Sequence, residues 1–351
     1  MSILKVGFIG AGTVSTMHIL GYQNNPKAKL AAICDVNREL ALERAKAWGI
    51  PEGRVFTDHH QLLNLAELDM VEVLLPDYLH YPITMDAIAA GKHVSVQKPM
   101  AMNVSEADKM IAAARAKGVS LRIFEQFIFM PQMRRAKELV EAGEIGDLLT
   151  IRLKTIKATS PDCWKTLPDT WQKDASRRAG GDWLTDDGYH MYALAWYFMG
   201  LPEEVHTWRG ETKLPSGDVI DIPSIVTWKL PGNRFGSWEV VRAKDMVINT
   251  DYYASDDQVE ITGTKGLIWV LRGHGKLFDC PVVILYKDRK MHTFSDINTG
   301  WEQSFIKCTH HYIDALEKGV PALLTGEQGR EITRWCTAVE KSADSGSSVR
   351  L

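Results

Sequence analysis

The sequence predicts an α/β protein whose first third forms a doubly wound, parallel sheet. Short apolar strands alternate with helical stretches of about 10–15 residues as far as Phe124, which is the pattern of a parallel sheet. A glycine-rich turn follows the first strand, and two later strands end in proline-containing turns. Because open α/β sheets bind ligands at the carboxyl ends of their strands, these turns mark the expected site.

Composition excludes several classes of function. With 351 residues the chain is long enough for two domains, and its formal net charge of −3 gives no field that attracts nucleic acid or an anionic membrane. The five cysteines are scattered without a C-x-x-C pair, which suits reduced thiols rather than disulfides or zinc. The chain starts without a signal-like segment, so we expect a cytoplasmic protein that binds neither membrane nor nucleic acid.

The turn after the first strand is a dinucleotide-binding fingerprint. Residues 10–15 read GAGTVS, which is G-x-G-x-x-G with serine in the third place, and a helix-like run to Gln23 follows. The glycines permit a tight turn and the close approach of a pyrophosphate. We predict that cofactor contacts come from the following residues of this turn: Gly10, Gly12, Thr13 and Val14.

Asp35 ends the second strand, about 20 residues beyond the turn, where an acid binds the ribose hydroxyls of the adenosine. A carboxylate there repels a 2′-phosphate, so NAD is favoured over NADP. Arg38 leaves this choice open, because it is placed to stack on adenine or to reach a phosphate. The structural alternative for Asp35 is a simple turn aspartate.

Two further strand ends face the same crevice. The strand 70–75 ends in Leu75 and Pro76, with His80 four residues further on, and the strand 94–96 ends in Gln97, Lys98 and Pro99. Pro99 has a fixed φ and no N–H, so the chain must leave the sheet there. Lys98 is then either an ordinary solvated lysine or a cation at the site. The cofactor-binding set therefore also includes Leu75, Pro76, His80, Gln97 and Lys98.

A second polar stretch lies at residues 180–190, which open a helix. Asp186 and His190 are four residues apart, so both side chains lie on one helical face. Singly, Asp186 is explained as a helix N-terminal charge and His190 as a core histidine. The neighbouring Asp187 leaves open which carboxylate points inward.

Four motifs together resemble the Gfo/Idh/MocA oxidoreductases. They are Gly10-Ala11-Gly12 with His18, Pro76-x-x-x-His80, residues 90–94 (AGKHV), and Gln97-Lys98-Pro99. The resemblance implies a Rossmann domain, residues 1–124, followed by a C-terminal α/β domain, residues 125–351. That second domain would carry a large, open, mostly antiparallel sheet, which is one wall of the site and often an oligomer interface. The family usually has E-K-P, and here Gln97 replaces the glutamate.

The resemblance also assigns the site. Residues 180–190 are similar to the family's G-G-G-x-x-x-D-x-G-x-H, which implies Lys98, Asp186 and His190 as catalytic residues. The arginine or tyrosine that usually precedes F-x-P is missing, and Gln126 takes a plausible substrate-pocket position. Trp164 lies in a polar loop placed to cover the site. The expected substrate-binding residues are therefore Gln126, Trp164, Asp186 and His190.

The function expected on this basis is an NAD-dependent dehydrogenase for a secondary alcohol of a sugar, polyol or glycoside, with C3 of a glucoside as the leading substrate. His190 would accept the hydroxyl proton, and Lys98 would stabilise the alkoxide. Asp186 would either hydrogen-bond the substrate hydroxyl or orient His190. An NAD-dependent glycosidase and a non-catalytic, NAD-binding regulator are the alternatives. We expect a homo-oligomer, a dimer or tetramer.

No metal site is expected. The pairs His59-His60 and His310-His311 are adjacent in sequence, and adjacent side chains point in different directions on a helix or strand. Surface or helix-end roles are the better explanation, since no H-E-x-x-H spacing occurs.

Overall fold

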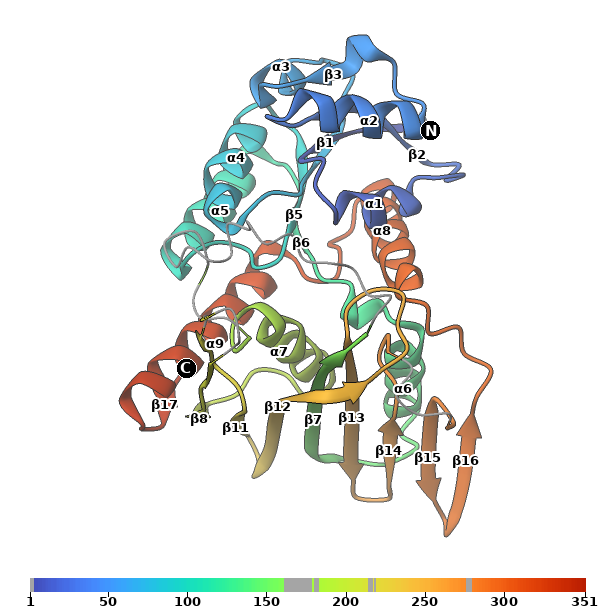
Figure 1. Ribbon diagram of the computed structural model, residues 1–351, viewed down its shortest axis with the longest axis vertical. Helices are drawn as coiled ribbons and strands as arrows, with labels where there is room; N and C mark the ends of the chain where they lie inside the picture. Colours follow the sequence, from blue (N-terminus) through green and yellow to red (C-terminus); the bar gives the residue numbers. More distant parts are fainter. Residues whose placement is uncertain (1–2, 161–178, 180–182, 214–216, 218, 276–279) are drawn as a thin grey trace. The chain divides into compact units, whose positions relative to one another are not determined.

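The computed structural model describes residues 3–160, 179, 183–213, 217, 219–275 and 280–351 (Figure 1). It divides them into two compact units. The first unit contains Met1–Gln126 and Phe305–Thr333, and the second contains most of the remaining residues, among them Gly180–Ser304 and Arg334–Leu351. No helix in the described part of the chain is long and apolar enough to cross a membrane.

The first unit is built on a six-stranded, parallel sheet in the order β3-β2-β1-β4-β5-β6. This confirms the doubly wound sheet. The strand order reverses between β1 and β4, so the crevice at the carboxyl ends of these strands lies beside the glycine-rich turn. The strands are β1 (Leu4–Ile9), β2 (Ala28–Cys34), β3 (Val55–Phe56), β4 (Met70–Val73), β5 (His93–Gln97) and β6 (Leu121–Phe124).

Five α-helices and two 3₁₀ turns connect these strands in the described residues: α1 (Ser15–His18), η1 (Ile19–Gly21), α2 (Arg38–Trp48), η2 (Glu52–Arg54), α3 (His59–Leu63), α4 (Asp77–Ala89) and α5 (Val104–Lys117). The run to Gln23 predicted as helical is instead the short α1 followed by η1. Helix α2 has the expected ends, since Asn37 accepts a hydrogen bond from the N–H of Leu40 and Gly49 adopts φ 73°.

The chain enters the first unit a second time. Helix α8 (Trp301–Lys318) places Tyr312 and Ile313 in the same buried cluster as Val6 and Phe8 of β1. The Tyr312 hydroxyl donates a hydrogen bond to the Val94 carbonyl of β5 at 3.0 Å. The core of this unit therefore depends on residues from both ends of the chain.

The second unit contains a nine-stranded sheet in the order β16-β15-β14-β13-β7-β12-β11-β8-β17. In the described residues of this sheet only the β7–β12 pair is parallel, so the sheet is mostly antiparallel, as expected. The strands are β7 (Leu148–Thr159), β8 (Glu204–Arg209), β11 (Ser224–Leu230), β12 (Arg234–Val247), β13 (Ser255–Gly263), β14 (Gly266–Val270), β15 (Val283–Lys287), β16 (Lys290–Phe294) and β17 (Val349–Arg350). A separate pair is formed by β9 (Thr212–Lys213) and β10 (Val219–Ile220).

Aromatic side chains form the core on one face of this sheet. Tyr192 of α7 (Asp186–Met199) stacks on Trp335 of α9 (Gly326–Ser345) at 5.2 Å between ring centroids. Tyr192 also meets Trp238 of β12 edge-on, and Trp335 meets Trp228 of β11 edge-on. Two more elements precede the sheet in the chain, η3 (Phe127–Phe129) and α6 (Pro131–Glu141).

We predict unequal stability effects for alanine at the first two glycines of the turn. Gly10 has φ 111°, and a Cβ there would lie 2.2 Å from the Leu74 carbonyl oxygen, whereas a Cβ on Gly12 would meet nothing within 4 Å. Gly10→Ala should therefore lower the free energy of unfolding by roughly 2 kcal/mol or more, and Gly12→Ala should change it by less than about 0.5 kcal/mol. Urea unfolding of the two variants tests this. Equal losses would contradict the steric argument.

Candidate active site

The glycine-rich turn is held from two sides and leaves Gly12 open. The Asp35 carboxylate accepts the Ala11 N–H at 2.7 Å with one oxygen and the Asn37 N–H at 2.8 Å with the other. The buried Ser15 hydroxyl donates to the Gly12 carbonyl at 2.6 Å. The open space at Gly12 fits the approach of a pyrophosphate. Thr13 and Val14 lie on the same turn, exposed and half-buried respectively.

Arg38 lies at the surface, at the first position of α2. It pairs with Glu52 at 2.9 Å, and both side chains are more than half exposed, at 54% and 72%. A surface pair of this kind contributes little to stability. Any contact between Arg38 and an adenine ring stays a prediction.

The His80 side chain contacts the backbone at the ends of both β4 and β5. Its ring is fully buried, with Nδ1 2.6 Å from the Pro99 carbonyl and Nε2 2.7 Å from the Leu75 carbonyl. Burial lowers the pKa of His80 to about 4, and the charge of Lys98 adds to this, while the two carbonyls oppose it. The neutral ring donates to only one of these carbonyls, but it fixes the spacing of both turns.

The side chain of Gln97, at the end of β5, makes hydrogen bonds to Lys98 and His18. The Lys98 backbone N–H donates to Oε1 of Gln97 at 2.8 Å, and Nε2 of Gln97 lies 3.1 Å from Nε2 of His18. Gln97 thus contacts residues of its own unit on both sides of its amide. The predicted cofactor contacts of Leu75, Pro76 and Gln97 remain predictions.

In the second unit, His190 lies on α7 against an aromatic ring. It is 6% exposed and stacks on Phe127 at 4.0 Å between centroids, with the rings 14° from parallel. Asp186, one turn earlier, is exposed. Asp187 instead forms an ion pair with Lys157 of β7 at 2.5 Å, and the Lys157 ammonium lies over the Trp183 ring. The two neighbouring carboxylates are therefore in different environments.

Three polar residues around α7 were missed from the sequence: Lys157 and Asp257, which interact with Asp187, and His274, which interacts with His190. Burial lowers the pKa of His274 to about 3, and the charges of Lys157 and His190 contribute. Burial raises the pKa of Asp257 to about 7, against the opposing effects of Lys157 and of the Thr155 hydroxyl, which donates to Asp257 at 2.7 Å. The signal that could have found Asp257 is the period of two that it shares with Val259 and Ile261.

The remaining predicted substrate residues are Gln126 and Trp164. Gln126 is 3% exposed, and its carbonyl oxygen has no hydrogen-bond partner among the described residues. Trp164 lies outside the described residues.

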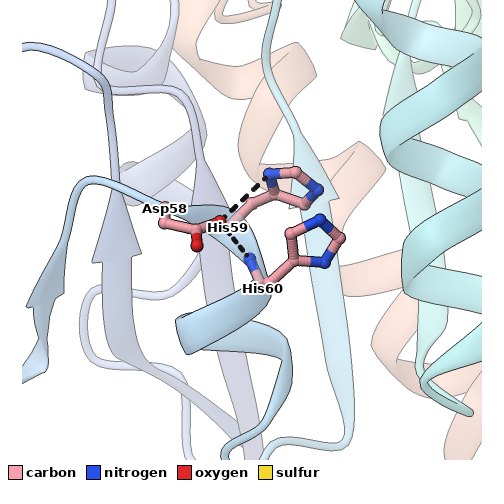
Figure 2. A group of neighbouring side chains, drawn as sticks. All are labelled: Asp58, His59 and His60. Carbon is pink, nitrogen blue, oxygen red and sulfur yellow. Dashed lines mark hydrogen bonds and ion pairs between the residues drawn. The ribbon is translucent and has the colours of Figure 1, made fainter.

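The pair His59-His60 lies at the start of α3 (Figure 2). The expectation that the two rings point in different directions was wrong, because their centroids are 4.0 Å apart. Asp58 caps the helix by accepting the His60 N–H at 2.9 Å, and Nε2 of His59 lies 2.9 Å from Asp86 of α4. These contacts join α3 to α4, which is the helix-end role expected. The donor atoms of Asp58, His59 and His60 also lie within 4.8 Å of one another.

We predict that Asp257→Asn stabilises the protein in a pH-dependent way. Because the folded-state pKa of Asp257 is raised to about 7, the folded protein keeps a proton that the unfolded chain releases above its ordinary carboxyl pKa. The free energy of unfolding therefore falls as pH rises from the ordinary carboxyl pKa to the raised pKa of about 7. The fall is roughly 1.4 kcal/mol for each unit by which folding raises the pKa, and it is complete above pH 7. Asparagine removes this loss, so the variant should gain most over the wild type at pH 8 and least at pH 4.

Urea unfolding at pH 4, 6 and 8 measures this difference. Asp245→Asn is the matched control, since Asp245 carries the same charge on an exposed part of β12. A constant difference between Asp257→Asn and wild type over this range would contradict the prediction.

Comparisons with known proteins agree with this architecture. Residues 4–124 match the model of an oxidoreductase family with an NAD-binding Rossmann fold, and residues 137–351 match that family's C-terminal α/β domain. The chain is 25% identical to myo-inositol 2-dehydrogenase of Thermotoga maritima, over 99% of this chain and 98% of that protein. It is 24% identical to D-glucoside 3-dehydrogenase of Escherichia coli, over 100% and 98%.

Solved structures give the same result for the fold. Levoglucosan dehydrogenase in complex with NADH and levoglucosan is similar with a TM-score of 0.83 at 22% identity, over 99% of both chains. Aldose-aldose oxidoreductase from Caulobacter crescentus is similar with a TM-score of 0.83 at 21% identity, over the full length of both chains. The two family models together span most of the sequence, and the chain belongs to the Gfo/Idh/MocA family of oxidoreductases.

Proposed function

We propose that this oxidoreductase is an NAD-dependent dehydrogenase that oxidises a secondary alcohol of a sugar, polyol or glycoside. The observation that carries the proposal is the pairing of Asp186 and His190 on one face of α7, in a chain that also presents Lys98 at a strand end and an open glycine turn. Relatives named as inositol, glucoside and levoglucosan dehydrogenases support a carbohydrate substrate. A glucoside oxidised at C3 is the leading candidate, because the glucoside 3-dehydrogenase aligns over the whole chain.

In this proposal the protein supplies proton transfer and charge stabilisation. The bound NAD supplies the hydride acceptor. His190 accepts the proton of the substrate hydroxyl, and Phe127 fixes the plane of its ring. The Lys98 ammonium stabilises the negative charge that develops on the substrate oxygen. His274 is neutral near pH 7, so it adds no second positive charge beside the imidazole that receives the proton.

Asp186 is the carboxylate that we assign to the reaction. Asp187 is engaged with Lys157 at 2.5 Å, and its side chain is 20% exposed. Asp186 is exposed and lies on the His190 face of the helix. We therefore assign it the role of accepting a hydrogen bond from a substrate hydroxyl and of orienting His190.

Asp35 supports NAD over NADP. Its two oxygens already accept the N–H groups of Ala11 and Asn37, so the carboxylate is held next to the turn. A 2′-phosphate at this position would meet a fixed negative charge.

A panel of sugars, polyols and glycosides with NAD and with NADP tests the proposal through the absorbance of the reduced cofactor. We expect reduction with NAD and a keto product. A hydrolysed glycoside without net NADH would instead identify a glycosidase. Binding of NAD without turnover across the panel would favour a regulator.

The outer face of the nine-stranded sheet supports a homo-oligomer. Large apolar side chains stay exposed there, among them Trp208 at 58%, Phe235 at 50% and Met291 at 60%. An exposed apolar surface of this kind is typical of an interface. We expect light scattering to give a mass of at least twice 39.4 kDa, and Phe235→Lys to lower it. A monomeric wild type would refute this part of the proposal.

The two neighbouring aspartates should give different variants. Asp186→Asn should lower kcat by about 10²-fold or more with little change in the melting temperature, because it removes a group at the reacting atoms. Asp187→Asn leaves the mostly buried Lys157 ammonium without its carboxylate, so it should destabilise the fold by about 3 kcal/mol. Turnover and thermal unfolding of both variants distinguish the roles. A catalytic loss confined to Asp187→Asn would reverse the assignment.

A further inference from the structure

A continuous chain of hydrogen bonds runs from a buried carboxylate to the backbone of Lys98. Glu72 of β4 is fully buried, and its Oε2 lies 2.5 Å from Nδ1 of His18. Nε2 of His18 lies 3.1 Å from the side-chain nitrogen of Gln97. Oε1 of Gln97 accepts the Lys98 N–H at 2.8 Å. All four residues belong to the first unit.

The direction of every bond in this chain follows from one fact, that a backbone N–H only donates. Lys98 N–H therefore requires the oxygen of the Gln97 amide, which turns the NH₂ group of Gln97 toward His18. Nε2 of His18 must then accept, so the ring proton lies on Nδ1 and is donated to Glu72. His18 is thus a neutral imidazole in a single tautomer.

The charges around the ring agree with this assignment. Two groups contact Glu72: the Tyr22 hydroxyl donates to it at 2.7 Å, and the Arg122 guanidinium of β6 lies 3.9 Å away. Cys308 and Tyr312 of α8 in turn contact Arg122. Lys98 lies at the opposite end of this series of hydrogen bonds from Glu72. Next to His18, the Glu72 carboxylate is balanced by the Arg122 guanidinium, so a neutral His18 adds no unpaired charge to this pair. A further buried carboxylate, Glu125, acts on Cys308.

We propose that Gln97 is a positioning residue for Lys98, and that its amide, where the family usually has glutamate, keeps His18 neutral. The His18 ring cannot move away, because it packs on Phe124 at 3.9 Å between centroids and meets Phe305 edge-on. A glutamate at position 97 has no proton to donate. His18 would then need N–H groups on both ring nitrogens and would take up one proton from solvent, which also balances the added carboxylate.

The role in positioning Lys98 rests on the proposed dehydrogenase function, whereas the tautomer of His18 does not. The first measurement is therefore independent of any substrate. Two-bond ¹H–¹⁵N spectra of histidine-labelled protein at pH 7.5 report whether each ring nitrogen carries a proton, and His18→Gln identifies the His18 signals. We expect a proton on Nδ1 only in the wild type, and protons on both nitrogens in Gln97→Glu.

The matched control is Gln61→Glu, which makes the same charge change on the exposed surface of α3. It should leave the His18 signals and the turnover as in the wild type. A doubly protonated His18 or a proton on Nε2 in the wild type would overturn the hydrogen-bond direction. A neutral His18 in Gln97→Glu would overturn the claim that residue 97 sets its protonation.

The second measurement is turnover. Gln97→Met keeps the length of the side chain but removes both hydrogen bonds, and we expect kcat to fall about tenfold, the effect of one hydrogen bond of ordinary strength. Gln97→Glu restores an acceptor for the Lys98 N–H and should recover most of this loss. Lys98→Met gives the kcat that remains when the lysine ammonium is absent. Wild-type kcat in Gln97→Met would refute the positioning role, while absence of turnover in the wild type would refute the dehydrogenase function and leave the tautomer result standing.

Discussion

The buried carboxylate of Glu72 is the constraint on which the first unit depends. A charge without solvent exposure is tolerated only if partners and hydrogen bonds surround it. Here its two oxygens contact three side chains: His18 and Tyr22 from the segment after β1, and Arg122 from β6. Arg122 is itself held between the rings of Phe124 and Tyr312 and donates to the Cys308 carbonyl. One carboxylate thereby fixes the relative places of two strands, the first helix and α8.

Much of the fold was predictable because its signals are local. Gly49 and Gly118 end their helices at φ 73° and 71°, the left-handed conformation that glycine favours. The errors occurred where the pattern is weak. Helix α4 begins directly after Pro76 and continues past Pro82, although a proline inside a helix usually breaks it. Strand β8 has a weak pattern too, since only Val205 and Thr207 of its residues are buried.

The arrangement of the candidate site was predictable to a smaller extent, and the roles of its residues remain predictions. Lys98, Asp186 and His190 follow from their positions at a strand end and on one helical face. Lys157 does not, because the sequence of a strand does not distinguish a polar residue that faces the core from one that faces water. His274 lies in no helix or strand and so in no periodic pattern. Asp257 was missed although its period of two with Val259 and Ile261 indicates the core face. The contact between His18 and Gln97 joins residues 79 positions apart, and nothing local to either residue predicts it.

The return of the chain through α8 separates the order of synthesis from the order of folding. Tyr312 and Ile313 complete the core that Val6 and Phe8 begin, so the cofactor-binding unit stays unfinished until the ribosome has translated eight of the nine strands of the second unit's sheet. The same topology limits how evolution or an engineer can exchange this unit between proteins. A single crossover after Phe124 would transfer the parallel strands without the helix against which they pack. Two crossovers, one at each passage of the chain, are needed to transfer a complete unit.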